Sequence, residues 1–210
     1  MNSKPTFTDR LRLIFKGILD PIGAFLNRTG LTPNAITLLG LAGTTVGAYF
    51  ISQGKMTIGG IVILLFVLVD TLDGTMARLR GDPSDFGGFV DSVSDRYAEF
   101  ITFGGLLYYF LSTGNYPGVM VTFLATAGSV LVSYVKARAE GLNFTAKVGI
   151  LTRVERYIVL IPLLIFNQPF LAVALIALLG NITAFQRIAH VRVQGHERMR
   201  KAKETKEYLQ

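Results

Sequence analysis

Four aspartates stand at short, regular intervals within a strongly apolar part of the chain: Asp70, Asp73, Asp91 and Asp95. A charged side chain near a bilayer centre costs about 2.5 to 3.5 kcal/mol on insertion scales, so such acids indicate a functional site with a cationic partner. Two carboxylates about 4 Å apart would otherwise repel by about 4 kcal/mol at an effective dielectric constant of 20. Oxygen ligands without histidine or cysteine favour magnesium, manganese or calcium, and paired acids suggest two ions that bridge a substrate phosphate.

The spacing places these acids on two helical stripes. At about 100° per residue, each stripe falls within about 60° of its first acid. The first stripe consists of Asp70, Asp73, Gly74 and Ala77, and the second of Gly87, Asp91 and Asp95. Between them, Leu79 to Phe86 contains Gly81 and Pro83 and is expected to form a turn, with Ser84 or Asp85 capping the second helix. Two antiparallel helices would then bring the acids face to face.

Small residues accompany the acids. Gly74, Ala77 and Gly87 remove side-chain bulk, which leaves room for a substrate or for closely packed backbone. Arg78 stands at the edge of the first stripe, where a planar guanidinium can hold phosphate oxygens in a bidentate way. The pattern therefore favours chemistry on a phosphorylated substrate.

These residues together match the pattern D-x2-D-G-x2-A-R-x8-G-x3-D-x3-D at every fixed position. The pattern resembles the signature of the CDP-alcohol phosphatidyltransferase family, whose members are integral membrane enzymes. They move a phosphatidyl group from a CDP-linked lipid to an alcohol, release CMP and use divalent metal ions. The resemblance implies two Mg²⁺ or Mn²⁺ ions and a homodimer.

The resemblance also implies residue roles. Asp70, Asp73 and Asp91 would ligate the metal ions, and Asp95 would complete the site and act as general base on the acceptor hydroxyl. The implied CDP contacts are Thr32, Pro33, Asn34, Gly74, Ala77, Arg78 and Gly87.

Composition predicts an all-α integral membrane protein. The chain has 210 residues, 50% of them hydrophobic, and a mean hydropathy of +0.45, which leaves too few polar residues to cover a soluble domain of that size. The absence of cysteine excludes disulfides and thiolate catalysis. We expect one domain, residues 1–210, that comprises an interfacial amphipathic helix (1–30), a bundle of six transmembrane helices (31–192) and a basic cytoplasmic tail (193–210).

Apolar periodicity supports this division. Between residues 7 and 26, apolar side chains recur at helical spacing with charged residues on other faces, as in a helix that lies at a membrane interface. Six apolar stretches follow that are candidates for crossing a bilayer. They run from Ala35 to Ile51, Thr57 to Leu72, Phe89 to Leu111, Tyr116 to Val135, Tyr157 to Phe166 and Pro169 to Ala189. The fifth is short, and its helix is expected to begin near Thr152.

The basic residues predict the orientation. Along six crossings, Lys55 alone of the 21 lysines and arginines falls on the side away from the N-terminus. The N-terminal side, with the acids near it, is therefore expected to be the cytoplasmic face of the plasma membrane. The net charge of +7 is explained by this topology and by anionic lipid, and no nucleic-acid partner is expected.

Five cations are expected near the acids at that face: Lys136, Arg138, Arg153, Arg156 and Arg187. Topology alone can account for each one, but together they suggest a phosphate-binding pocket for the acceptor. The segments 133–140 and 153–156 resemble the phosphatidylinositol phosphate synthase branch of the family, whose acceptor is inositol phosphate. Glu99 is either an acid behind the metal ligands or the partner of Arg96.

Other functions remain open at this point. The same chemistry could use glycerol phosphate, serine or inositol as acceptor, or an archaeal CDP-diether lipid as donor. A UbiA-like membrane prenyltransferase also binds a diphosphate through aspartates and magnesium, but no second acidic motif follows Asp95. A cation transporter would also carry acids at membrane depth.

Overall fold

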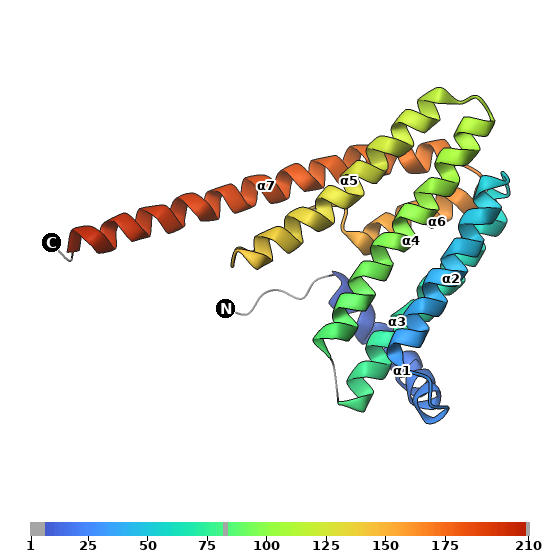
Figure 1. Ribbon diagram of the computed structural model, residues 1–210, viewed down its shortest axis with the longest axis horizontal. Helices are drawn as coiled ribbons and strands as arrows, with labels where there is room; N and C mark the ends of the chain where they lie inside the picture. Colours follow the sequence, from blue (N-terminus) through green and yellow to red (C-terminus); the bar gives the residue numbers. More distant parts are fainter. Residues whose placement is uncertain (1–6, 82–83, 209–210) are drawn as a thin grey trace.

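The computed structural model describes residues 7–81 and 84–208, and this part of the chain is helical without strands. Figure 1 shows the long helices in two groups that diverge at a wide angle, with the final helix projecting beyond the others. The helices are α1 (Phe7–Arg28), α2 (Pro33–Ser52), α3 (Met56–Arg80), α4 (Asp85–Ser112), α5 (Tyr116–Gly141), α6 (Arg153–Ile165) and α7 (Pro169–Tyr208). The predicted all-α class is confirmed.

The turn between α3 and α4 lies where the sequence predicts it. α3 ends at Arg80, and Gly81 follows in the left-handed region with φ +69°, where glycine has no side-chain clash. Ser84 caps α4, because its hydroxyl accepts a hydrogen bond from Gly87 N at 3.0 Å. Pro83 lies outside the described residues. The chain thus reverses between the two acidic stripes.

α2 packs closely against both α3 and α4, and so joins the two helices that carry the acids. Glycines allow the close approach of α2 to α3. A Cβ added to Gly59 would lie 2.7 Å from Gly47 O, and one added to Gly43 would overlap the ring of Phe66. The small residues of α2 therefore serve packing within one chain.

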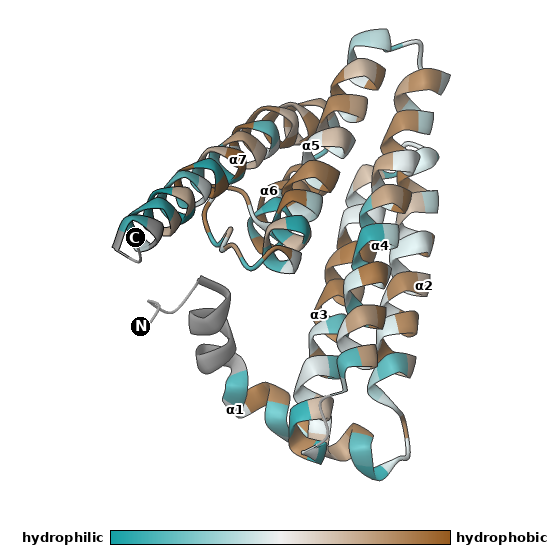
Figure 2. Cartoon of the chain, turned by 60° about the vertical axis from the view of Figure 1, so that its left-hand side comes forward, coloured by the Kyte–Doolittle hydropathy of each residue, from teal (hydrophilic) through white to brown (hydrophobic). Residues whose placement is uncertain are grey.

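α1 rests on the outside of this bundle. Its Leu19 and Leu26 pack against Leu72 and Met76 of α3, while Phe25 is exposed. Asn27 is held at 3.1 Å by Met76 O and at 2.7 Å by Arg80 Nε. Figure 2 shows α1 at the end of the bundle where the α3–α4 turn lies. The helix is confirmed, and its position at a membrane interface stays a prediction.

Four helices, α2, α3, α5 and α7, are long and apolar enough to cross a membrane. Exposed large apolar side chains lie along them, such as Leu38, Leu65 and Phe123. Figure 2 shows these helices largely in apolar colours, apart from the hydrophilic C-terminal half of α7. The chain is therefore a membrane protein. α4 is long enough but carries Asp91, Asp95, Arg96 and Glu99 within its length. α6 begins next to Thr152, as predicted, but its 13 residues span only about 20 Å at 1.5 Å per residue.

Candidate functional site

Three of the four predicted acids form one cluster. Asp70 of α3 and Asp91 and Asp95 of α4 each offer a carboxylate oxygen, and these oxygens lie within 4.8 Å of one another. Asp95 is buried with 5% of its surface exposed, so its charge needs a cationic partner. The donor set consists of hard oxygens without nitrogen or sulfur, which fits Mg²⁺ or Mn²⁺.

Asp73 lies beside this cluster and faces α2. Its Oδ2 accepts a hydrogen bond from Thr37 Oγ1 at 2.6 Å, and its Oδ1 accepts one from Gly74 N. Thr37 is buried, so the carboxylate of Asp73 is oriented by a residue that the sequence analysis did not select. Gly40, one turn further along α2, leaves space for Asp70, since an added Cβ would lie 3.0 Å from Asp70 Oδ1.

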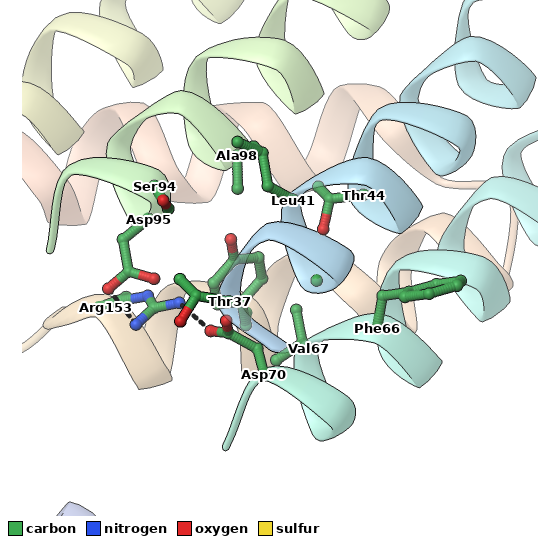
Figure 3. Close-up of a pocket in the computed structure, with 12 residues that line it drawn as sticks. Thr37, Leu41, Thr44, Phe66, Val67, Asp70, Ser94, Asp95, Ala98 and Arg153 are labelled. Atoms are coloured by element: carbon green, nitrogen blue, oxygen red, sulfur yellow. Dashed lines mark hydrogen bonds and ion pairs between the residues drawn. The ribbon is translucent and has the colours of Figure 1, made fainter. Parts of the chain in front are cut away.

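Arg153, the first residue of α6, joins the two sides of the acid cluster. Its Nη2 lies 3.1 Å from Asp70 Oδ2, and its Nη1 forms an ion pair with Asp95 Oδ2. Figure 3 shows the guanidinium between the two carboxylates. Tyr157 lies one turn further along α6, and its buried hydroxyl has no hydrogen-bond partner among the described residues. One predicted acceptor cation therefore meets the predicted metal ligands directly.

Arg156 occupies a different environment. Its Nε and Nη2 donate to Glu99 Oε1 at 2.8 and 2.5 Å, and both side chains are buried. The partner of Glu99 is thus Arg156 of α6, whereas Arg96 lies 3.6 Å from Asp95. This buried pair ties α4 to α6 behind the acid cluster.

The other three candidate cations lie further along α5 and α7. Arg187 is buried and donates to two backbone carbonyls, Val148 O at 2.9 Å and Val132 O at 2.5 Å. Lys136 is exposed and lies 3.9 Å from Glu140, and Arg138 is also exposed. The five cations therefore occupy distinct environments, and of these only Arg153 contacts the acid cluster in the described part of the chain.

The predicted CDP contacts come from α2, α3 and α4. An added Cβ on Gly87 would lie 3.6 Å from Asn34 Oδ1, so these two candidates are neighbours. An added Cβ on Gly74 would lie 3.4 Å from Arg78 Nη1, and Arg78 Nη2 donates to Thr75 Oγ1 at 2.9 Å. Small residues and potential donors thus share one end of the α2–α3–α4 unit.

Thr32 and Pro33 begin α2 at that same end. The hydroxyl of Thr32 accepts a hydrogen bond from Ala35 N at 3.2 Å, and Pro33 is the first helical residue, where proline is tolerated. Ala77 is half-buried on α3. These residues shape the backbone at the mouth of the candidate site.

Comparison with known proteins agrees with this geometry. Residues 30–186 match the family model of CDP-alcohol phosphatidyltransferases. The chain belongs to this family and is a transferase, so the prenyltransferase and transporter alternatives are excluded. The matched range contains the whole acid cluster together with Arg153 and Arg156.

Two relatives with named activities are similar to this chain over most of its length. The chain is 36% identical over 201 residues to the phosphatidylinositol phosphate synthase of Streptomyces avermitilis, a match that covers 89% of this chain and 82% of that protein. It is 36% identical over 181 residues to the archaetidylinositol phosphate synthase of Pyrococcus horikoshii, covering 85% and 93%.

Crystal structures of the phosphatidylinositol phosphate synthase of Mycobacterium tuberculosis share the fold. The structure with CDP-DAG bound has a TM-score of 0.76 at 33% identity and covers 83% of this chain and 93% of that chain. The complex with manganese and citrate has a TM-score of 0.79 at 34% identity and covers 83% and 88%.

Proposed function

We propose that the protein is a phosphatidylinositol phosphate synthase that transfers the phosphatidyl group of CDP-diacylglycerol to inositol phosphate and releases CMP. The observation that carries the proposal is the contact of Arg153 with Asp70 and Asp95. It places a guanidinium, which suits phosphate recognition, directly beside the carboxylates that suit a metal-bound diphosphate. The names of the bacterial relatives support the same acceptor.

Asp70, Asp73, Asp91 and Asp95 would hold the divalent ions, two Mg²⁺ or Mn²⁺ by the family pattern. Bound ions neutralise the donor diphosphate and the charge that develops on the leaving CMP. Asp95 takes the proton from the acceptor hydroxyl as its oxygen attacks the β-phosphorus of the donor. The new bond joins that oxygen to phosphorus, and the bond from phosphorus to the CMP oxygen breaks. A carboxylate is a weak base for an alcohol, so positioning supplies much of the rate.

The donor nucleotide would lie at the open end of α2, α3 and α4. Arg78 would contact a phosphate oxygen, and the missing side chains of Gly74 and Gly87 would let the nucleotide approach the helices. Asn34 is placed beside Gly87, where its amide could hydrogen-bond the nucleotide. Thr32, Pro33 and Ala77 would complete the wall of this site.

The acceptor phosphate would lie on the side of Arg153 that faces α5 and α7. Lys136 and Arg138 are exposed near the end of α5, and we propose that they reach the acceptor phosphate from that helix. Arg156 and Arg187 already donate hydrogen bonds to other residues of the chain. We therefore propose that they hold the surrounding helices and loop in place and also contribute positive charge to the wall of the pocket. Together the five cations favour an acceptor that carries its own phosphate.

The archaeal relative supports the alternative of a CDP-diether donor. Parallel assays with CDP-diacylglycerol and its diether analogue test the donor, and inositol phosphate, glycerol phosphate, serine and inositol test the acceptor. Mass spectrometry of the lipid product identifies the pair that reacts. We expect phosphatidylinositol phosphate as the main product, and efficient use of serine or free inositol would refute the proposed function.

For the membrane arrangement we propose six crossings, with α4 and α6 added to the four apolar helices. Asp91 and Asp95 of α4 belong to the acid cluster and Glu99 is paired with Arg156, so these charges would be shielded from lipid. The loop before α6 would bring the chain into the membrane interface. The single domain would be a homodimer in the plasma membrane, with the site at the cytoplasmic face. Because the chain has no cysteine, single cysteines introduced at Thr113 and Lys147 can be labelled from each side. Six crossings put Thr113 on the outer side and Lys147 on the cytoplasmic side, whereas omission of α4 exchanges the two sides. Labelling of Thr113 from the cytoplasmic side would therefore refute the six-crossing arrangement, and crosslinking tests the dimer.

A further inference from the structure

The loop between α5 and α6 is held along its length by one face of α7. Near its end, Leu151 N donates to Thr183 Oγ1 at 2.9 Å, and Val148 O accepts from Arg187 Nε at 2.9 Å. Thr183 and Arg187 are one helical turn apart. Gln194 and Arg198, which contact the start of the loop, are also one turn apart. The loop therefore lies antiparallel along the helix as a series of side-chain to backbone contacts.

Gln194 and Arg198 make the contacts at the start of the loop. The amide of Gln194 satisfies both backbone groups of Thr145, accepting from its N at 3.0 Å and donating to its O at 2.7 Å. Arg198 donates to Asn143 O at 2.6 Å and to Leu142 O at 3.2 Å. We call Gln194 and Arg198, with the loop segment 142–145 that they hold, the loop clamp.

Arg198 also lies over an aromatic ring, with its Cζ 4.0 Å from the centroid of Phe144. A guanidinium stacked on a ring and bonded to two carbonyls is fixed in position, unlike a cation on a solvated helix face. Asn143 adopts a left-handed φ of +56°, so the start of the loop has a defined turn that these contacts hold. The guanidinium of Arg198 thus binds the start of the loop within the same chain.

The far end of this loop is the candidate active site. Leu151 and Thr152 lead directly into Arg153, which contacts Asp70 and Asp95. Arg156 Nη1 also points back at the carbonyl of Leu151 at 3.5 Å. The position of Arg153 therefore depends on the path of the loop as well as on α6.

We propose that Gln194 and Arg198 are positioning residues for the acceptor site. They belong to the C-terminal extension of α7, residues 187–208. By holding the loop before α6, this extension sets the position of Arg153. This inference rests on the proposed function, because it assigns Arg153 to the acceptor. Both residues lie beyond residue 186, where the match to the family model ends. The extension of α7 would thus contribute to the reaction through residues that lie outside the family signature.

The test compares Gln194→Ala and Arg198→Ala with Arg200→Ala in the purified full chain. Arg200 is exposed on the same extension and pairs only loosely with Glu204, at 3.6 Å. Each clamp variant should raise the acceptor KM by about three- to tenfold and leave the donor KM within about twofold. Arg200→Ala should change neither constant.

Two further measurements separate a clamp from a general effect of charge. Arg198→Lys keeps the charge but not the planar fork, so it should retain most of the defect. Amide hydrogen exchange in residues 142–152 should be faster in both alanine variants than in the wild type. A normal acceptor KM in Arg198→Ala, or full recovery in Arg198→Lys, would overturn the inference.

Failure of the proposed function has a different signature. It would appear in the wild-type chain, as transfer to an alcohol other than inositol phosphate. The KM comparison is then made with the alcohol that the wild type uses, and an unchanged acceptor KM in both clamp variants would still overturn the role of the clamp.

Discussion

The acidic and basic sides of the candidate site are assembled in different ways. The acids come from α3 and α4, which are joined by one short turn, and three of them meet within 4.8 Å. The cations come from α5, α6 and α7, and Arg156 and Arg187 are bonded to other parts of the chain. A cluster within one helical hairpin is therefore assembled by local geometry, whereas the basic side depends on how distant helices pack.

The largest expected effect comes from the acidic side. Asp95→Asn removes the proposed base, and we expect the rate of transfer to fall by about 10² to 10⁴, the range of general acid–base catalysis. Donor binding should be largely retained, because the other acids remain. Steady-state CMP release and CDP titration measure the two effects. Asp85→Asn, an exposed change in the first turn of α4, is the control, and substantial activity in Asp95→Asn would contradict the assignment.

The second prediction concerns stability on the basic side. Arg156→Ala would leave Glu99 buried without its partner, and breaking a buried ion pair costs about 3 to 5 kcal/mol. The thermal unfolding temperature in detergent should therefore fall strongly, and replacing both residues by leucine should recover much of the loss. Lys136→Ala breaks only an exposed pair and should leave stability nearly unchanged. A stable Arg156→Ala variant that lost only acceptor affinity would assign Arg156 to phosphate binding alone.

Arg153 lies where the two sides meet, so its replacement should show which side it serves. Arg153→Ala should raise the acceptor KM by roughly one to two orders of magnitude, because a charged hydrogen bond contributes about 1.5 to 3 kcal/mol. The donor KM should change little. Lys147→Ala removes an exposed cation from the preceding loop and serves as the control. An increase confined to the donor KM would place Arg153 on the nucleotide instead.

The sequence could predict the acidic side because every step was local. Helical spacing aligned Asp70 with its neighbours, and Gly81 and Ser84 marked the turn that faces them toward the second stripe. Thr37 could not be selected, because its role depends on α2 packing against α3. The sequence could not predict the partner of Glu99 either. Arg96 is close to it in sequence, but the fold brings Arg156 to it.

Thr37 provides a smaller test of the acidic side. Thr37→Val keeps the shape of the side chain but removes the hydroxyl that donates to Asp73. Residues that orient metal ligands typically contribute about 10- to 100-fold in metal affinity, and we expect about tenfold here. The Mn²⁺ concentration that gives half-maximal activity measures it. Thr45→Val, on an exposed face of α2, should behave as the wild type. If both variants had the same metal dependence, Asp73 would not be a metal ligand that Thr37 orients.

The smallest expected effect is at the donor end. Arg78→Ala should weaken CDP binding by about fivefold, less than a buried charged contact would, because the side chain is exposed. Arg78→Lys keeps the charge without the bidentate geometry and should be nearly as weak. Titration with CDP gives the affinities. Unchanged binding in Arg78→Ala would leave the arginine with a topological role.

Metal dependence of the complete reaction tests the central claim most directly. With CDP-diacylglycerol and inositol phosphate, the purified protein should form CMP and phosphatidylinositol phosphate in equal amounts when Mg²⁺ or Mn²⁺ is present. A chelator should abolish both products, and added metal should restore them. Transfer that continued in excess chelator, or CMP release without the phosphorylated lipid, would contradict the account.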